Sequence, residues 1–215
     1  MYNDNHHQNN NNSNNDLFLQ IKGPARAELK IKGSRFIASV RKVATEEEAQ
    51  LAIEEIKKEF HDATHNCYAW KVGHGKKMRY RYADDGEPNN TAGLPILKSI
   101  DNRKLSNILV VVTRYFGGVK LGTGGLIRAY SKATMDALKE CEIEKNYLNE
   151  TVVFKTGFEF VNLVHNIIGT YKAALKDSSY GEDAEFTVEV RSSKYKEFKT
   201  KLKDGTNGQV EFIKQ

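Results

Sequence analysis

The stretch ILVVVTRYFGGVKLGTGGLIRAY, residues 108–130, organises the first part of the chain. It opens with five apolar, mostly β-branched residues, 108–112, a pattern typical of a strand that is buried on both faces. A glycine-rich segment, 117–125, follows, and a helix is predicted from Leu126 to about Glu140. Alanines recur at every fourth position of that helix, which allows it to approach a sheet closely. The stretch therefore predicts a domain of mixed α and β structure.

The segments on either side of this stretch extend the same pattern. Thr45 followed by Glu48 forms a capping box, and apolar residues then recur at helical spacing up to Phe60. Gly33 supplies a turn between two strands, and residues 84–93 are too polar and glycine-rich for a strand. The predicted elements before residue 108 are strands at 26–31 and 35–43, a helix from 45 to about 60, a hairpin of strands at 66–72 and 77–82, and a short helix at about 94–100.

The last 66 residues read as a separate unit. Strands are predicted at 151–158, 176–180, 185–191 and 209–214, with helices at 160–175 and 194–202. This βαββαβ order is the ferredoxin-like arrangement. We therefore expect an α+β protein with two domains, residues 17–149 and 150–215, behind a leader of residues 1–16.

The leader differs from the rest of the chain in composition, since eight of its first fifteen residues are asparagine. Such a segment buries too little surface to offset its ordering entropy, so it is expected to be disordered and without a catalytic role. The sequence contains neither an apolar run of about 18 residues nor a secretory signal, which predicts a cytoplasmic protein without membrane association. Cys67 and Cys141 are accordingly expected to be reduced thiols in the core.

Charge is distributed unevenly along the 215 residues, which carry 33 basic and 28 acidic side chains. The whole net charge of +5 lies in residues 1–149, with 23 basic and 18 acidic side chains, whereas residues 150–215 hold ten of each. With 39% hydrophobic residues and three prolines, the composition excludes collagen-like, mucin-like and wholly disordered proteins. A mild basic excess attracts nucleic acid, an acidic protein surface or anionic lipid alike.

The glycine-rich segment allows two interpretations. Backbone N–H groups at a helix N-terminus favour anions, which suggests a phosphate cradle. However, Ile127 stands where a dinucleotide fingerprint requires its third glycine, and Thr123 stands where a P-loop requires lysine. The simpler interpretation is that the glycines allow tight turns and close packing.

A cluster of acidic residues, Asp84, Asp85 and Glu87, also has competing interpretations. With His65 they could bind a hard cation such as magnesium. The interpretation we favour is a structural salt-bridge network with Arg114 and Arg128, since adjacent carboxylates on a loop are common and no further ligand spacing supports a metal. A third possibility is a partner-binding surface of mixed charge.

Nucleic-acid binding has support from cations interleaved with tyrosines. The cations are Lys76, Lys77, Arg79, Arg81, Arg114, Lys120, Arg128 and Lys132, and the tyrosines are Tyr80, Tyr82, Tyr115 and Tyr130. Alternation along a strand places Tyr80 and Tyr82 on one face, so these rings either stack on bases or belong to the core. Cys67 shares a strand face with His65, which by itself does not make either side chain reactive.

Four spaced motifs resemble those of the IMPACT family over about residues 22–140. They are His65-x-Cys67-x-Ala69, Asp-Asp-Gly-Glu-Pro at 84–88 with Thr91-Ala92-Gly93, Val110-Val111-Val112-x-Arg114-Tyr115-Phe116-Gly117-Gly118, and Leu121-Gly122-x-Gly124-Gly125-Leu126-x-Arg128-Ala129-Tyr130. The second domain resembles that of the YigZ-type branch, which is similar in shape to the last domain of elongation factor G. Asn90 stands where the family commonly has glycine, and asparagine is the next most tolerant residue at positive φ.

This resemblance implies a ribosomal protein S5 domain 2-like fold for the first domain, followed by the ferredoxin-like domain. It also implies a function in translation. Eukaryotic relatives usually carry a separate N-terminal RWD domain and bind an activator of an initiation-factor-2 kinase, which damps the amino-acid starvation response. For the YigZ-type branch, association with RNA or the ribosome is the implied role.

We therefore expect a non-enzymatic, cytoplasmic regulator of translation, without a metal or cofactor, whose partner is a translation-related protein or RNA on the ribosome. The alternative is a metal-assisted hydrolase that uses His65, Asp84, Asp85 and Glu87. The oligomeric state has no signature in the sequence. The expected ligand- or partner-binding residues are His65, Asp84, Asp85, Glu87, Arg114, Gly117, Gly118, Lys120, Gly122, Gly124, Gly125 and Arg128.

Overall fold

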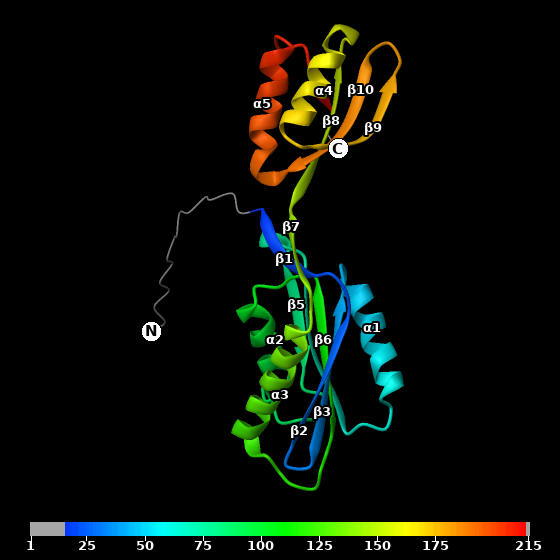
Figure 1. Ribbon diagram of the computed structural model, residues 1–215. Coiled ribbons are helices and arrows are strands. Elements are labelled where there is room, and N and C mark those ends of the chain that lie inside the picture. Colours follow the sequence, from blue (N-terminus) through cyan, green and yellow to red (C-terminus); the bar gives the residue numbers. More distant parts are fainter. Residues whose placement is uncertain (1–15, 214–215) are drawn as a thin grey trace, which may run out of the picture. The chain divides into compact units, whose positions relative to one another are not determined.

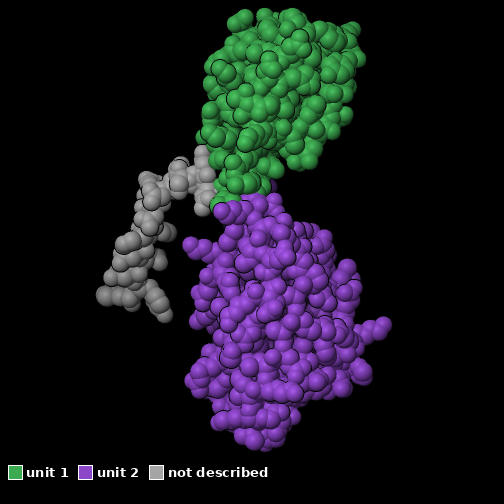
Figure 2. Space-filling model, in the orientation of Figure 1, with its two compact units in different colours: residues 1–17, 147–215 green, residues 18–146 purple. Residues whose placement is uncertain are grey.

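The computed structural model describes residues 16–213, which form two compact units (Figure 1 and Figure 2). The larger unit comprises residues 18–146, and the smaller one comprises residues 16–17 together with 147–213. Helices and strands occur in both units, so the chain is an α+β protein with two domains, as predicted. The predicted leader, apart from Asp16, lies outside the described residues. Within residues 16–213, no helix is both long and apolar enough to cross a membrane.

An antiparallel sheet of five strands, in the order β2-β3-β6-β4-β5, forms the centre of the larger unit. Two further strands, β1 and β7, pair with each other and were not predicted from the sequence. The strands in this part of the chain are β1 (Leu17–Ile21), β2 (Ala25–Ile31), β3 (Ser34–Lys42), β4 (His65–Val72), β5 (Arg79–Ala83), β6 (Ile108–Tyr115) and β7 (Ile143–Tyr147). The helices are α1 (Glu46–Glu59), α2 (Gly93–Asn102) and α3 (Gly122–Lys139), with a 3₁₀ turn, η1 (Gly75–Lys77).

Helices cover both faces of this sheet (Figure 1). Val110 and Val112 of β6 belong to the cluster that contains the apolar sides of α2 and α3. Leu109 and Val111 belong to the cluster on the opposite face, which contains residues of α1. The continuous apolar run that predicted a doubly buried strand is therefore confirmed, although β6 is antiparallel to both of its neighbours.

Helix α1 begins at the predicted capping box. The Oγ1 atom of Thr45 accepts a hydrogen bond of 3.2 Å from the Glu48 amide, and the Glu48 carboxylate accepts one of 2.7 Å from the amide of Ala44. The chain leaves the helix at Phe60. Local sequence is sufficient here because the cap and the apolar period agree.

Helix α3 starts at Gly122, one turn before the predicted start at Leu126. Glycine is a poor helix former, so the local sequence argues against a helix here, but the first turn extends a helix that tertiary packing holds in place. Its Ala129, Ala133 and Ala137 are fully buried, and the helix packs on β2, β3 and β6. The prediction of close helix-to-sheet packing is confirmed.

The smaller unit has the βαββαβ order that was predicted. Its antiparallel sheet has the strand order β11-β8-β10-β9, which is the ferredoxin-like arrangement. The strands are β8 (Asn149–Thr156), β9 (Ala174–Tyr180), β10 (Ala184–Arg191) and β11 (Glu211–Ile213). The helices are α4 (Val161–Thr170) and α5 (Tyr195–Gly205), with 3₁₀ turns η2 (Phe158–Phe160) and η3 (Ser192–Lys194).

Helix α4 ends five residues earlier than predicted. Lys172 takes a positive φ of 50°, and the amide of Ala173 donates to the carbonyl of Ile168 over 3.0 Å, which closes the helix in the manner of a Schellman cap. The sequence has lysine, not glycine, at this position, so it does not predict the cap. Leu175, the last residue of the predicted helix, instead lies in β9 with 40% of its surface exposed.

Candidate functional site

A cleft of about 480 Å³, which we call the α3 cleft, lies in the larger unit. It forms where the start of β4, the loop 84–92, the end of β6 and the start of α3 meet. Strand pairing explains this meeting, because His65 of β4 lies opposite Arg114 of β6 in the antiparallel register. The residues lining the cleft are Thr64, His65, Glu87, Pro88, Arg114, Phe116, Lys120, Leu121, Gly122, Thr123 and Leu126.

A buried ion pair joins Arg114 to Glu87 at the cleft. The Nη1 atom of Arg114 donates to Oε1 of Glu87 over 2.5 Å, and the Tyr130 hydroxyl donates to the same oxygen over 2.8 Å. The Nη2 atom of Arg114 lies 3.3 Å from the Ser34 hydroxyl oxygen. Its Nε atom is buried and has no hydrogen-bond partner within residues 16–213. The predicted pairing of Arg114 with this carboxylate cluster is confirmed for Glu87.

The loop 84–92 holds the ring of His65 in one orientation. The Nδ1 atom of His65 lies 2.8 Å from the carbonyl oxygen of Asp85, and since a carbonyl only accepts, Nδ1 carries the proton. Gly86 beside the ring has a φ of 88°, a backbone conformation that favours glycine, and a Cβ there would lie 3.4 Å from Nδ1. The Nε2 atom is 3.9 Å from Oε1 of Glu87.

Asp84 closes the loop onto the start of α2. One carboxylate oxygen accepts hydrogen bonds from the amides of Ala92 and Gly93, at 3.0 and 2.8 Å. The other accepts from the amide of Asn90 over 2.8 Å. Asn90 has a φ of 61°, so the expectation that asparagine adopts the turn conformation of glycine is confirmed. Asp84 is therefore a structural residue of the loop.

Asp85 also has structural partners. Its carboxylate accepts from the amide of Asn66 over 2.6 Å and pairs with the ammonium group of Lys57 at 2.9 Å. The predicted ion pairing of the loop carboxylates with Arg128 is wrong, since none of the ion pairs found in residues 16–213 includes Arg128. The same residues contain no group of three or more His, Cys, Asp or Glu side chains placed to hold a metal ion. This geometry gives the hydrolase alternative no support.

The glycines of the 117–125 segment fall into two groups. Gly117 packs against the backbone of Gly33, and Gly118 has a positive φ of 83°. Gly122, Gly124 and Gly125 belong to the first turn of α3. The simpler interpretation therefore applies to the first group, with close packing at Gly117 and a turn at Gly118, whereas in the second group a Cβ on Gly122 would meet nothing within 4 Å.

The start of α3 has the electrostatics of an anion site. The helix is 18 residues long, its first turn contains no acidic residue, and no side chain caps it. The first N–H groups of a helix have no partners inside it, and they carry the positive end of the macrodipole. Lys120 and Arg128 are exposed beside this turn. A Cβ on Gly124 would lie 3.4 Å from the guanidinium of Arg128, so this side chain extends back over the first turn.

Cys67 is not placed to act as a nucleophile. It is fully buried, and its thiol lies 2.8 Å from the carbonyl oxygen of Asp84 and 3.4 Å from the Tyr130 hydroxyl. Burial raises the pKa of the Cys67 thiol to about 12, so it stays protonated at neutral pH. Both cysteines are free thiols as expected, but Cys141 is only partly buried.

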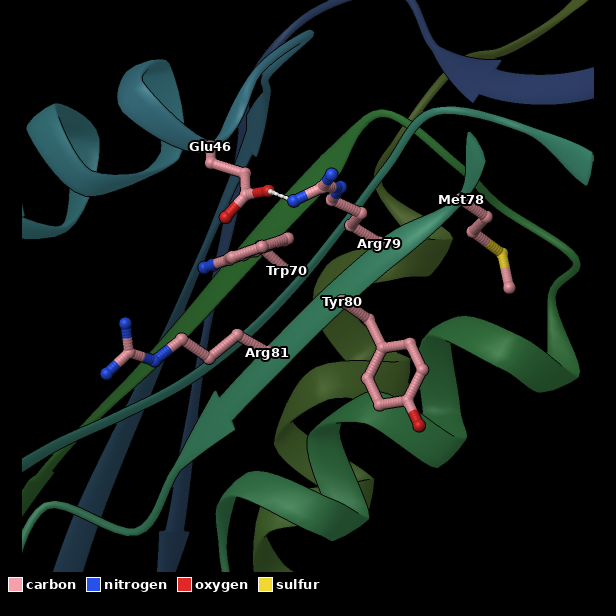
Figure 3. A pocket seen from close by; sticks show the side chains of 6 residues that line it. All are labelled: Glu46, Trp70, Met78, Arg79, Tyr80 and Arg81. Atoms are coloured by element: carbon pink, nitrogen blue, oxygen red, sulfur yellow. Dashed lines mark hydrogen bonds and ion pairs between the residues drawn. The ribbon is translucent and has the colours of Figure 1, made fainter. Parts of the chain in front are cut away.

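A second groove, of about 400 Å³, lies on the outer strand β5 (Figure 3). Figure 3 shows Arg79 and Arg81 on the side of Trp70, and Tyr80 extending to the other side of the strand. Tyr80 is 57% and Tyr82 36% exposed, so the interpretation that these two rings are core residues is wrong. Tyr130, in contrast, is fully buried and cannot stack on a base.

The cleft thus unites five of the predicted site residues, His65, Glu87, Arg114, Lys120 and Gly122. Sequence reasoning missed the cleft residues Thr64, Phe116 and Thr123. The sequence around them carried no separate signal, because they line the cleft only through the packing of β4, β6 and α3. Phe116 is 47% exposed, so its ring is open to a ligand in the cleft.

Comparisons with known proteins agree with this architecture. Residues 32–138 match the Impact N-terminal domain, and residues 161–209 match a domain of unknown function, DUF1949. The chain is 36% identical over 191 residues to IMPACT family member YvyE of Bacillus subtilis, covering 89% of this chain and 88% of the relative. It is 29% identical over 191 residues to IMPACT family member YigZ of Escherichia coli, covering 88% and 94%.

A third relative, Protein IMPACT of Mus musculus, is 30% identical over 120 residues, which cover 54% of this chain and 36% of the relative. A solved structure described as the crystal structure of a hypothetical protein superposes with a TM-score of 0.66 at 28% identity, covering 93% of this chain and 98% of that one. The two domain matches lie one in each unit, and the Impact N-terminal domain match includes the residues that line the α3 cleft. The chain therefore belongs to the IMPACT family, in its YigZ-type branch.

Proposed function

We propose that this chain is a non-enzymatic, cytoplasmic regulator of translation that binds RNA on or near the ribosome. The role in translation is suggested by membership of a family that includes eukaryotic IMPACT proteins. RNA is suggested by the surface of the larger unit, which carries the excess positive charge of the chain.

The observation that carries the proposal is the pair of exposed cations, Lys120 and Arg128, at the uncapped start of α3. Neither side chain forms an ion pair within the part of the chain that the structure describes. Together with the helix macrodipole, they create a positive surface without a local counter-charge. Backbone phosphates of RNA bind such surfaces through their negative charge.

The tyrosines of β5 add a second element that RNA binding uses. Tyr80 and Tyr82 are exposed, and exposed aromatic rings stack on bases without sequence preference. Arg81 lies on the opposite side of the strand, next to Trp70. The tyrosines support binding of single-stranded RNA rather than of duplex RNA, whose bases are already stacked.

The test is the salt dependence of binding to a single-stranded RNA that has hydroxyl groups at both ends. We expect affinity to fall steeply with salt, and the double variant Lys120→Ala, Arg128→Ala to bind more weakly and with a shallower slope. Each lost phosphate contact removes about 0.7 from the slope of log affinity against log salt. The matched control is Lys30→Ala, Lys98→Ala, which removes two exposed lysines from β2 and α2 and so lowers the net charge equally.

Equal losses of RNA affinity in the two double variants would show that only the net charge of the chain matters. Undetectable RNA binding by the unmodified chain would refute the proposal. A second candidate, binding to a protein of the translation machinery, is favoured by the match to eukaryotic IMPACT, which is confined to about half of this chain. Affinity capture from a lysate with and without nuclease separates the two candidates. A partner that survives nuclease supports the protein candidate, and a partner that is lost supports RNA.

A further inference from the structure

We propose that the α3 cleft binds the phosphate group of a phosphorylated nucleotide, with the nucleotide base against Phe116. This inference rests on the proposed function for its RNA context and deepens it. The general surface described above contacts the backbone of any RNA, whereas the cleft accepts one terminal phosphate and the nucleotide attached to it. The same chemistry is presented by a free nucleoside monophosphate and by the phosphorylated end of an RNA.

The first argument is the unsatisfied guanidinium of Arg114. Its side chain is 6% exposed and lines the cleft, and its Nε atom has no partner within residues 16–213. A buried donor without a partner costs free energy, so each such donor calls for an explanation, one of which is a missing ion. Glu87 neutralises the charge of Arg114 and fixes its plane through Nη1, but leaves Nε unpaired. Arg114 thus has hydrogen-bonding capacity that residues 16–213 do not use, and its side chain lines the cleft.

The second argument is the start of α3, which lines the same cleft with Gly122 and Thr123. The first turn has neither a capping side chain nor an acidic residue. A Cβ at Gly122 would meet nothing within 4 Å, so the backbone is open to a ligand there. Backbone N–H groups at a long helix N-terminus are donors that phosphate oxygens use.

The third argument is the composition of the remaining wall. Phe116, Leu121 and Leu126 are apolar, and Phe116 is 47% exposed. An inorganic anion would leave this wall unused, whereas a base attached to the phosphate would stack on the ring. A volume of about 480 Å³ lies in the range of small-ligand pockets, about 300–1,000 Å³.

The charge of the ligand follows from the donors. Glu87 pairs with Arg114, so the net positive charge of the cleft comes from Lys120 and the helix start, beside the remaining donors of the Arg114 guanidinium. Together they suit an anionic group with several free oxygens. A phosphomonoester has three such oxygens and a charge between about −1.5 and −2 at neutral pH. An internal phosphodiester has two free oxygens and one charge, so it satisfies fewer of these donors.

The test uses the full chain and the variant Thr123→Asp. A carboxylate in the first turn of α3 stabilises the helix, so the variant is expected to fold, while its charge repels an anion in the cleft. Arg114 is unsuitable for this purpose because its removal leaves the buried Glu87 carboxylate without its counter-charge. The matched control is Thr200→Asp, the same substitution at an exposed position of α5 in the other unit.

Two pairs of probes are compared by calorimetry at one salt concentration. They are adenosine 5′-monophosphate against adenosine, and a short single-stranded RNA with a 5′-phosphate against the same RNA with a 5′-hydroxyl. We expect the phosphate to strengthen binding at least tenfold in one or both pairs, and Thr123→Asp, but not Thr200→Asp, to remove that gain. A gain with the monophosphate alone identifies a free nucleotide as the ligand, and a gain with the RNA alone identifies an RNA end.

Amide NMR locates the bound phosphate independently of affinity, because the resonances of Gly122, Gly124 and Gly125 should shift when the phosphorylated probe is added. The inference is overturned if phosphate gives no gain in either pair, or if the gain persists in Thr123→Asp. Salt-dependent binding of the hydroxyl-ended RNA would then still stand, so the proposed function survives this failure. Conversely, binding of the monophosphate without any binding of RNA would uphold the cleft and refute the RNA proposal.

Discussion

The backbones of Gly33 and Gly117 are in direct contact, although 84 positions separate them in the chain. A Cβ on Gly33 would lie 2.8 Å from the carbonyl oxygen of Gly117, and a Cβ on Gly117 would overlap the carbonyl group of Gly33. The Gly117 amide also donates to the Ser34 hydroxyl over 3.2 Å. The contact joins the β2–β3 turn to the segment after β6, one wall of the α3 cleft.

Gly117→Ala should therefore destabilise the larger unit by about 2 kcal/mol or more, because the added methyl has no space. Trp70 is buried in this unit and is the single tryptophan of the chain, so its fluorescence in a urea titration reports on this unit. Gly23→Ala is the control, since a Cβ there meets nothing within 4 Å. If Gly117→Ala were as stable as the control, the two backbone segments could move apart at little cost in stability.

Removing the carboxylate of Glu87 should be among the most damaging changes to the larger unit. Glu87→Ala leaves Arg114 buried without its partner, and breaking a buried pair from one side costs about 3–5 kcal/mol. The comparison is Glu28→Ala, whose pair with Lys30 at 3.5 Å is exposed and should cost below about 1 kcal/mol. The measurement is the urea midpoint of unfolding, monitored by Trp70 fluorescence. Similar midpoints for the two variants would contradict the structural role of the buried pair.

The two thiols should differ in reactivity. Burial raises the pKa of the Cys67 thiol to about 12, and Cys141 is only partly buried. A chromogenic disulfide reagent at pH 8 should therefore modify Cys141 in the folded chain and both thiols in urea. In the variant Cys141→Ser, the folded chain should give no signal within the same time. Rapid modification of that variant would mean that the β4 region opens frequently.

His74 should make the larger unit less stable in mild acid. Its ring packs on Phe18 with centroids 3.6 Å apart, and Nε2 lies 3.3 Å from the side-chain nitrogen Nδ2 of Asn107, a donor that requires an unprotonated Nε2. Burial, and secondarily the charge of Lys71, lowers the pKa of His74 below 6.5. Below pH 6.5 the unfolded chain then binds a proton that the folded chain does not, so stability falls as the pH falls.

The measurement is a set of urea titrations between pH 7.5 and 5. A single group changes stability by at most about 1.4 kcal/mol per pH unit. His74→Gln keeps a polar side chain but does not titrate, so its stability should depend less on pH in this range. An unchanged pH dependence in His74→Gln would assign the effect to other groups.

Some elements of the fold were predictable because local and tertiary preferences agree. The capping box of Thr45 and Glu48 determined the start of α1, and the apolar run of β6 determined a doubly buried strand. Elsewhere tertiary packing outweighed local signals. Three glycines argue against the first turn of α3, and no glycine marks the cap at Lys172 that ends α4, yet both features are present.

By itself, the sequence determined which kinds of groups are available: three neighbouring carboxylates, a set of cations, and glycines that permit close approach. The tertiary structure alone decided how they pair. The antiparallel register that sets His65 opposite Arg114 brings Glu87 to the guanidinium, while Asp84 and Asp85 turn to backbone amides. The physical reason is that buried polar groups must find partners, and which partner is within reach depends on strand order and loop path, which no local pattern encodes.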